Sequence, residues 1–544
     1  MLFKKSLSLK KLFIFIKNSN KPKIKEIVKK TNKYNILDKK KEDGDSSVLS
    51  ALKILKHYTK KHNVELLSKE DNEGYLTILE ATQSNDVGTV QSVIAYADKN
   101  NIILNINDKD GNDDNPLIIS INNNNSEILK LLIDYSEKHH INLELNKKYS
   151  NDIYPLLMSS FQNNIEITKI LLEYADRHNI PLELNEKDII GNTPLLLATF
   201  SNNIDMVKCL INHAEKHNII LELNEKGNDN NNPLLFAIMS NNIEMANLLI
   251  EYSEKHNIIL DLNNTEEGKY PILYASIKDN IEMVKIIINY AEKHNIVLEL
   301  NEKNKKDTYP ALLAIINNNI EMIKLFVEYA NKHNILLKIN EKENDGNNLL
   351  LVAINNNNLE MVKLLLNYAN NHNIIFELNE NNSTGYNPLF ISTLNDNLEI
   401  TNLLMKYADN HNVKLDLNMK ANNGNYPFLL ATNNDSIKMA ELLIKYANQH
   451  NIVLNLNQKN DSGNYPLLFA TSRYNIEMIK LIMEYADKNN VILELNEKNN
   501  QGFNPLMHAY MCGSEDMDKL MFEYGEKHQT DFEGVEYLFS IFIQ

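Results

Sequence analysis

Histidine recurs at one position of this chain, at intervals of 38 to 39 residues where the spacing is unbroken, as between His178 and His217. The members of this histidine row are His62, His139, His178, His217, His256, His294, His333, His372, His411, His450 and His528. Imidazole binds zinc and titrates near neutral pH, so the row raises the question of a metal or catalytic site. Neighbouring members would lie about 10 Å apart if each repeat advances by one helix-packing distance, too far to share an ion. We therefore interpret the row as helix-end caps, and expect no metal, no cofactor and no catalytic residue.

A tyrosine row precedes the histidines by four residues, and His213 replaces tyrosine in it once. Its members are Tyr58, Tyr96, Tyr135, Tyr174, Tyr252, Tyr290, Tyr329, Tyr368, Tyr407, Tyr446, Tyr485 and Tyr524. Aromatic side chains at a fixed repeat position indicate a core between repeats, with hydroxyl groups that reach the surface. Stacking against a ligand is the alternative interpretation.

The remaining chemistry-bearing residues give no sign of an enzyme. Cys209 and Cys512 lie eight repeats apart, too far for an intrachain disulfide, and nothing near them in sequence predicts an activated thiol. Unpaired cysteines favour a reducing, cytoplasmic location, with the nucleus as the alternative. Phosphate-binding loops, dinucleotide-binding glycines, zinc-binding cysteine pairs and nucleophile elbows are absent from the sequence.

Charge and composition limit the class of partner that the chain can bind. The net charge is −16 over 544 residues, and arginine occurs only at Arg177 and Arg473. An acidic chain with so little arginine argues against nucleic-acid binding, which needs cations facing phosphates. Residues 1–30, by contrast, contain ten lysines and one glutamate. We interpret residues 1–44 as a basic leader that caps the array or is poorly ordered; a basic amphipathic membrane or targeting helix is the alternative.

Proline marks a period that runs through most of the chain. Its positions are Pro116, Pro155, Pro194, Pro233, Pro271, Pro310, Pro388, Pro427, Pro466 and Pro505, with Thr77 and Leu349 in the same register. Such a period predicts a solenoid, in which each repeat buries its apolar face against its neighbours. We divide the chain into a partial repeat at residues 45–76, about twelve repeats at residues 77–529, and a C-terminal cap at residues 530–544.

Each repeat predicts two helices and an extended segment. Pro194 suits the first turn of a short helix, and Thr193 before it is a good N-cap. Asn202 permits the tight turn into a second helix, whose apolar residues recur at helical spacing. The stretch "IILELN" that follows alternates as an extended segment does. Five repeats have tyrosine in place of the N-cap residue, and we expect these tyrosines to pack on a neighbouring repeat: Tyr154, Tyr270, Tyr309, Tyr426 and Tyr465.

A turn precedes each proline by three residues. Glycine occupies this turn position in eight repeats, and aspartate or asparagine occupies it in four: Gly74, Gly191, Gly268, Gly346, Gly385, Gly424, Gly463, Gly502, Asp113, Asp152, Asn230 and Asp307. All of these residue types accept a positive φ, so the position predicts a left-handed turn. On this argument Gly424→Asn should be nearly neutral and Gly424→Val destabilising.

The repeat resembles the ankyrin repeat. The opening Gly191-Asn192-Thr193-Pro194-Leu195 and Ala198 carry the resemblance, as does the "LELNEKD" stretch that ends a repeat at Asp188. Two departures are a period of 39 residues against about 33 in the family, and leucine at Leu196 where the family has histidine. We attribute the extra residues to a longer second helix. The resemblance implies an all-α solenoid of stacked helix-turn-helix units with hairpin-like loops.

The resemblance further implies a non-catalytic scaffold or adaptor that binds a partner protein on its concave face. Positions that vary between repeats are the candidates for this contact, and those chosen are Ile189, Ile190, Phe236, Tyr274 and Leu313. Drift at unconstrained surface positions is the competing explanation. We expect a monomer that binds a protein or peptide and makes no membrane contact. A structural or regulatory spacer, held near a membrane by the basic leader, is the alternative function.

Overall fold

The computed structural model describes residues 78–99, 101–263 and 268–530. These residues form 24 α-helices and one 3-10 helix at Ser150–Asp152, and no β-strand occurs among them. The predicted all-α class is therefore confirmed for the described residues. The proposed basic leader, the partial repeat and all of the proposed C-terminal cap except Thr530 lie outside the described residues.

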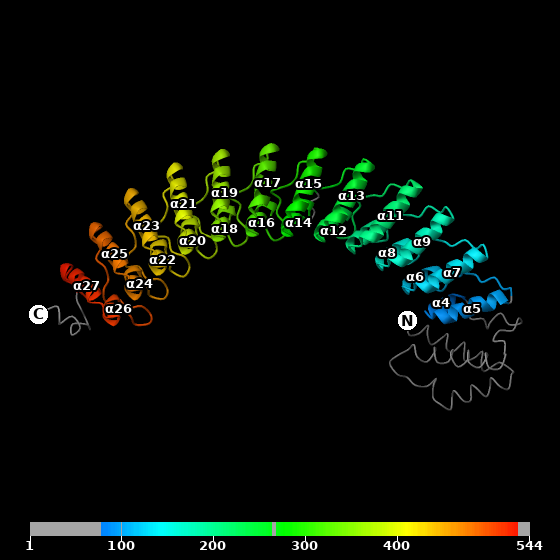
Figure 1. Ribbon diagram of the computed structural model, residues 1–544, viewed down its shortest axis with the longest axis horizontal. Coiled ribbons are helices and arrows are strands. Elements are labelled where there is room, and N and C mark those ends of the chain that lie inside the picture. Colours follow the sequence, from blue (N-terminus) through cyan, green and yellow to red (C-terminus); the bar gives the residue numbers. More distant parts are fainter. Residues whose placement is uncertain (1–77, 100, 264–267, 531–544) are drawn as a thin grey trace, which may run out of the picture. The chain divides into compact units, whose positions relative to one another are not determined.

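Each repeat contributes a short helix and then a long one (Figure 1). The short helices are α4 (Ile78–Gln83), α6 (Pro116–Asn122), α8 (Pro155–Phe161), α10 (Pro194–Phe200), α12 (Pro233–Met239), α14 (Pro271–Ile277), α16 (Pro310–Ile316), α18 (Leu349–Asn355), α20 (Pro388–Leu394), α22 (Pro427–Asn433), α24 (Pro466–Ser472) and α26 (Pro505–Cys512). The long helices are α5 (Val87–Lys99), α7 (Ser126–Lys138), α9 (Ile165–Arg177), α11 (Ile204–His217), α13 (Ile243–Lys255), α15 (Ile281–Lys293), α17 (Ile320–Lys332), α19 (Leu359–Asn371), α21 (Leu398–Asn410), α23 (Ile437–Gln449), α25 (Ile476–Lys488) and α27 (Glu515–Lys527).

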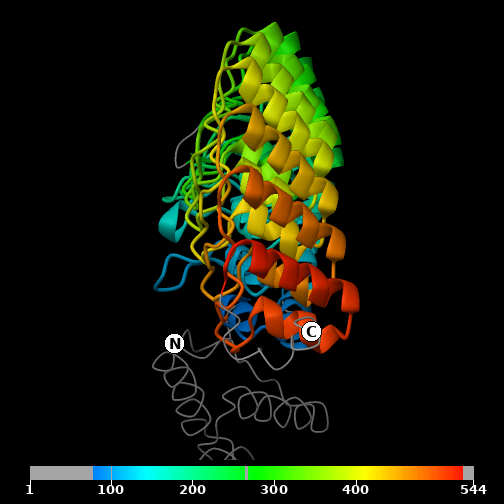
Figure 2. The same ribbon diagram turned by 90° about the vertical axis from the view of Figure 1, so that its left-hand side faces the viewer.

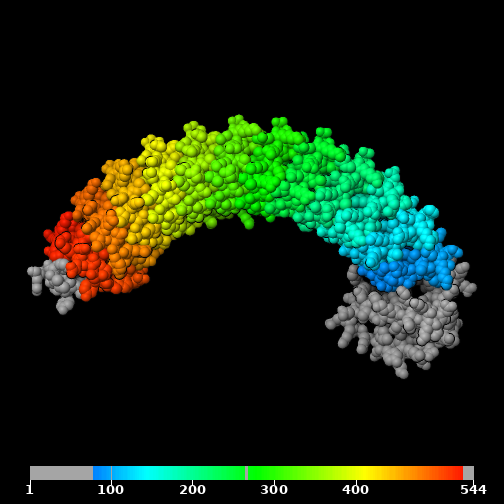
Figure 3. All heavy atoms as spheres, viewed as in Figure 1, coloured from blue at the N-terminus to red at the C-terminus, as the bar shows by residue number. Residues whose placement is uncertain are grey.

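The helices divide into two compact units. The first contains α4 to α9 and most of α11, and the second contains α12 to α27. The division passes through α10, between Leu197 and Ala198. Within the second unit, each helix packs mainly on its own partner and on the equivalent helices of the adjacent repeats. The space-filling view shows these repeats packed in chain order without a break (Figure 3). Such nearest-neighbour packing is typical of a solenoid.

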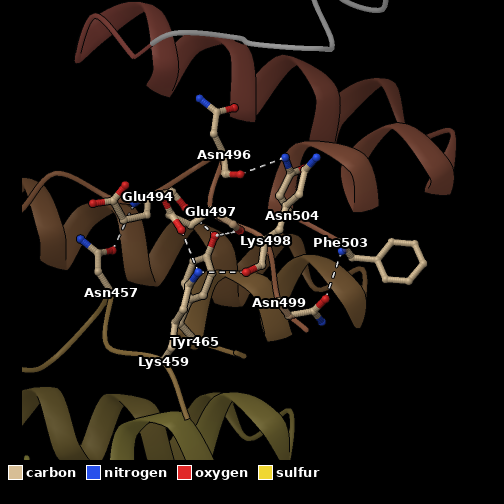
Figure 4. A network of polar contacts seen from close by, with 10 residues as sticks. All are labelled: Asn457, Lys459, Tyr465, Glu494, Asn496, Glu497, Lys498, Asn499, Phe503 and Asn504. Carbon is tan, nitrogen blue, oxygen red and sulfur yellow. Dashed lines mark hydrogen bonds and ion pairs between the residues drawn. The ribbon is translucent and has the colours of Figure 1, made fainter. Parts of the chain in front are cut away.

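The short helices begin as the sequence predicts. Thr193 and the five N-cap asparagines accept a backbone N–H three residues on, as from Leu196 N to Thr193 Oγ1 at 3.2 Å. The five tyrosines at this position are buried, and each hydroxyl donates to a carbonyl in the extended stretch that ends the same repeat. Tyr465 Oη, for example, lies 2.8 Å from Glu494 O and 2.9 Å from Glu497 O (Figure 4). These bonds tie the start of a repeat to its own end, and the packing of these tyrosines on a neighbouring repeat stays a prediction.

The turn between the two helices depends on asparagine. Asn202 adopts a φ of 52°, in the left-handed region, and equivalent residues do the same in the other repeats. One residue after this turn position, Asn242 caps α13 by accepting from Met245 N at 2.9 Å. Its Nδ2 atom also donates to Asn202 Oδ1 of the preceding repeat at 2.6 Å. One side chain therefore caps a helix and links two repeats.

The histidine row caps the long helices, as expected, because nine of its members are the C-cap residues of α7, α9, α13, α15, α17, α19, α21, α23 and α27. The tyrosine row lies in the core between repeats, and Tyr252 is 4% exposed. The expectation that its hydroxyls reach the surface is wrong. They bond backbone groups of the preceding repeat instead, as Tyr252 Oη accepts from Leu221 N at 3.1 Å.

The extended segments and turns lie together on one side of the helices in the second unit (Figure 2). Leu221 and Leu223 of such a segment are buried and Ile220 between them is exposed, as alternation predicts. At the turn position before the short helix, all eleven described residues have a positive φ, from 56° at Asp307 to 87° at Gly191. The predicted left-handed turn is therefore confirmed wherever the structure describes it.

Candidate functional site

Three of the five predicted contact residues occupy equivalent places on successive short helices of the second unit. Phe236, Tyr274 and Leu313 lie on α12, α14 and α16, and each side chain is half-buried. These three helices pack side by side. Within the second unit they line the inner edge of the curve, whereas the long helices line its outer edge (Figure 1). The prediction that these residues share one face of short helices therefore agrees with the structure.

More exposed apolar residues extend this face. Ile277 and Ile316 lie one helical turn after Tyr274 and Leu313 and are 41% and 45% exposed. Residues three apart on a helix share a face, so all of these side chains are neighbours. We name this set the inner row: Phe236, Tyr274, Ile277, Leu313 and Ile316. In the sequence, the variability of the third residue after proline indicates Phe236, Tyr274 and Leu313 but gives no sign of the two isoleucines.

The other two predicted residues lie in the first unit, at the tip of a turn. Ile189 and Ile190 are 64% and 52% exposed. Hydrogen bonds of its backbone N–H groups fix the turn, because Ile190 N donates to the side-chain Oδ1 of Asp188 at 3.0 Å and Ile189 N donates to Asn151 O at 3.3 Å. These two isoleucines belong to the first unit, whereas the inner row belongs to the second.

A second exposed apolar row follows the extended segments of the second unit. It consists of Ile220, Ile259, Val297, Leu336, Ile375, Val453 and Ile492, each between 51% and 61% exposed. The alternation of "IILELN" contains the signal for it, since the residue between two buried side chains must face the other way. No partner is assigned to this row.

The comparisons with known proteins bear on what such surfaces do. The family model described as ankyrin repeats (3 copies) matches residues 137–220, 156–262, 214–298, 291–375, 313–415 and 449–531. These ranges cover more than half of the chain.

The chain belongs to the ankyrin repeat family.

Among solved structures, this ankyrin repeat chain is similar to the ankyrin repeat domain of Bcl-3, described as a unique member of the IkappaB protein family. The sequence identity is 20% and the TM-score 0.33, with 47% of this chain and 100% of that chain covered. A search of curated proteins gave no match.

Ankyrin repeats are generally protein–protein interaction modules and are typically not enzymes. Burial raises the pKa of the Cys209 thiol and so disfavours its reactive thiolate. Within the described part of the chain, no helix combines the length and apolar character that crossing a membrane requires. Some ionisable side chains link consecutive repeats. His139 Nε2, for example, lies 2.9 Å from Asp98 Oδ1 of the preceding repeat.

Proposed function

We propose that this ankyrin repeat protein is a non-catalytic scaffold or adaptor that binds a partner protein through the inner row. The observation that carries the proposal is the run of apolar side chains on three adjacent short helices, where Ile277 and Ile316 are more than 40% exposed. Apolar groups gathered on one exposed face mark an interaction surface more often than isolated ones do. Membership of a family of interaction modules supports the same function.

The partner that fits this surface is a protein segment with apolar side chains spaced to meet successive repeats. Aromatic anchors contribute most at such contacts, and Phe236 and Tyr274 are of that kind. Phe236 is also held in place, because its ring packs edge-to-face on Phe200 with 5.3 Å between centroids. A side chain already fixed in the free protein loses less conformational entropy when a partner binds.

The test compares two sets of substitutions in the full chain. Ile277→Asp with Ile316→Asp changes the exposed part of the inner row and should leave folding intact. Lys285→Ala with Lys324→Ala changes exposed lysines of the long helices and is the matched control. Partners captured by the wild-type protein should be retained by the lysine variant and lost by the isoleucine variant.

The affinity of a purified partner makes the same test quantitative. The isoleucine variant should weaken binding at least tenfold, about 1.4 kcal/mol. Alanine at Phe236 and Tyr274 should weaken it by more than about 1 kcal/mol, as anchors do. Loss of binding in the lysine variant alone would place the contact on the long helices and contradict the proposal.

A structural or regulatory spacer is the second candidate, and the ten lysines in residues 1–30 favour its membrane-proximal form. Vesicles with and without anionic lipid, mixed with the full chain at low and high salt, test it. Binding that is salt-sensitive and requires anionic lipid would support a spacer at a membrane. We further propose that the protein works inside the cell, because its two cysteines are free, and that it is a monomer.

A further inference from the structure

The tyrosine row is interrupted once, and the interruption lies in the first unit. His213 on α11 stands where the other described repeats have tyrosine, four residues before His217. The two imidazole rings lie 4.3 Å apart between centroids, the separation found for the tyrosine–histidine pairs of other repeats. An imidazole therefore occupies the core position of a phenol ring at the same distance from the histidine that follows it.

Both histidines face one carboxylate of the preceding repeat. Asp176 lies near the end of α9, and its Oδ1 atom is 2.8 Å from His213 Nδ1 and 2.8 Å from His217 Nε2. One ligand atom from each residue lies within 4.8 Å of the other two. Across residues 78–99, 101–263 and 268–530, these three residues are the only histidine, cysteine, aspartate or glutamate group close enough to hold a metal ion.

The general scheme of the array explains Asp176 and His217 but not His213. A link from a row histidine to an acid of the preceding repeat recurs elsewhere, as between His528 and Asp487 at 2.7 Å. His213, by contrast, is only 3% exposed; its Nε2 atom has no hydrogen-bond partner, and its Nδ1 atom faces Asp176 Oδ1 at 2.8 Å. Its approach to Asp176 is close but lacks hydrogen-bond geometry. A buried polar group without a partner points to a ligand that completes its surroundings.

We propose that Asp176, His213 and His217 bind a divalent transition metal ion, with Zn²⁺ the best match. Two imidazole nitrogens and one carboxylate oxygen form a common set of protein ligands for zinc, and water takes the fourth position. Ligand atoms about 2.1 Å from zinc at tetrahedral corners lie about 3.4 Å apart, so these atoms must separate by about half an ångström. The ion would tie α9 to α11, the long helices of two consecutive repeats.

One neighbouring charge acts on this site. Lys216 Nζ lies 2.8 Å from Asp176 Oδ2 and leaves Oδ1, the oxygen that faces both histidines, for the ion. The ammonium group therefore favours binding through a single carboxylate oxygen. Its positive charge also opposes that of the ion, so we expect an affinity below that of sites with no adjacent lysine.

The experiment measures zinc binding by the full chain after removal of metal with a chelator. Calorimetric titration, or competition with a chromophoric chelator, should give one equivalent bound by the wild-type protein. His213→Tyr restores the residue that other repeats use and should keep the fold, while raising the dissociation constant at least a hundredfold. His411→Asn removes a row histidine that faces Asn370 instead of an acid, and it should leave binding unchanged.

A gain-of-site variant separates metal binding from any general effect of the substitution. Asp487, Lys527 and His528 repeat the arrangement of Asp176, Lys216 and His217, with 2.6 Å from lysine to carboxylate and 2.7 Å from histidine to carboxylate. Adding Tyr524→His to the His213→Tyr variant should therefore recover one equivalent of zinc. Equal zinc binding by the wild-type protein and the His213→Tyr variant would overturn the proposal, as would no binding by the wild-type protein at 100-fold excess of zinc.

Discussion

Gly424 offers a quantitative test of how the turns hold successive repeats together. It lies three residues before α22 with a φ of +75°. A Cβ atom added there would lie 2.9 Å from Asn460 Cα and 3.0 Å from Asp461 N, both in the turn of the next repeat. Backbone atoms cannot rotate away as a flexible side chain can. Gly502 has a similar φ of +87°, but nothing lies within 4 Å of its added Cβ.

The two glycines therefore separate the cost of the conformation from the cost of the contact. Placing alanine in the left-handed region costs about 1–2 kcal/mol at either position. Forcing an extra carbon against packed backbone adds about 1–3 kcal/mol at Gly424 alone. We expect Gly502→Ala to destabilise by about 1–2 kcal/mol and Gly424→Ala by roughly 2–5 kcal/mol.

Hydrogen exchange of the turn peptides, combined with thermal unfolding followed by circular dichroism, measures both effects. Exchange is needed because a long repeat array does not unfold as a single two-state unit. In the Gly424→Ala variant, faster exchange should appear in the turns at Gly424 and Asn460. Equal losses at Gly424 and Gly502 would refute the contact argument. No loss at either glycine would refute the argument from φ as well.

Three further predictions concern single positions or whole repeats. Tyr474 has a φ of 58° at a turn where other repeats use asparagine, aspartate or glycine. Tyr474→Asn should therefore raise the unfolding free energy by about 1 kcal/mol, and an unchanged thermal midpoint would contradict this. Hydrogen bonds from Lys138 and His139 lower the pKa of Asp98. This carboxylate therefore adds stability above its unfolded pKa that is lost as pH falls through its folded pKa, and Asp98→Asn should flatten the fall of the thermal midpoint below about pH 4. Deleting residues 388–426, one complete period, should leave a folded and shorter helical array, and a circular dichroism spectrum without helix would show that the repeats are not independent units.

The sequence predicts the helices and turns well because the residues that decide them act locally. Proline, the N-cap residue before it and the residue three positions before it each control a bond or a φ within a few residues. Twelve repetitions allow one such pattern to be checked against eleven others. Asp113 and Gly191 could thus be assigned to one left-handed turn, although their residue types differ.

Contacts between repeats are harder to predict because the two partners lie far apart in sequence. Asparagine is abundant in the chain, and in several repeats it forms hydrogen bonds to the next repeat. Asn224 Nδ2 donates to Ile259 O at 2.7 Å, and Asn224 Oδ1 accepts from Asp261 N at 3.0 Å. The expectation that Gly424→Asn is nearly neutral is wrong for the same reason. That expectation considers φ alone. It omits the Asn460 Cα atom, which would lie 2.9 Å from a Cβ atom added at Gly424.

The histidine row shows how an argument from spacing can be sound and still incomplete. Neighbouring histidines of the row lie on different repeats, about 10 Å apart by the helix-packing argument, which is too far to share a metal ion. That reasoning omits His213 and His217, which lie one turn apart on a single helix, and it omits Asp176 on the preceding repeat. The pattern "HAEKH" in α11, preceded by an acid in the repeat before it, is the sequence signal for this cluster.

His213 is either a tolerated departure from the repeat or a residue kept for zinc binding. The two explanations predict opposite orders of stability for the wild-type protein and the His213→Tyr variant when zinc is present. Without zinc, His213→Tyr removes a buried ring whose Nε2 atom has no hydrogen-bond partner, so the variant should be more stable than the wild-type protein. With zinc at 100 times its dissociation constant, the wild-type protein alone gains about 2.7 kcal/mol. The order of the two thermal midpoints should therefore reverse when zinc is added. A variant that stays more stable at every zinc concentration would mean that His213 is a tolerated departure from the repeat and holds no ion.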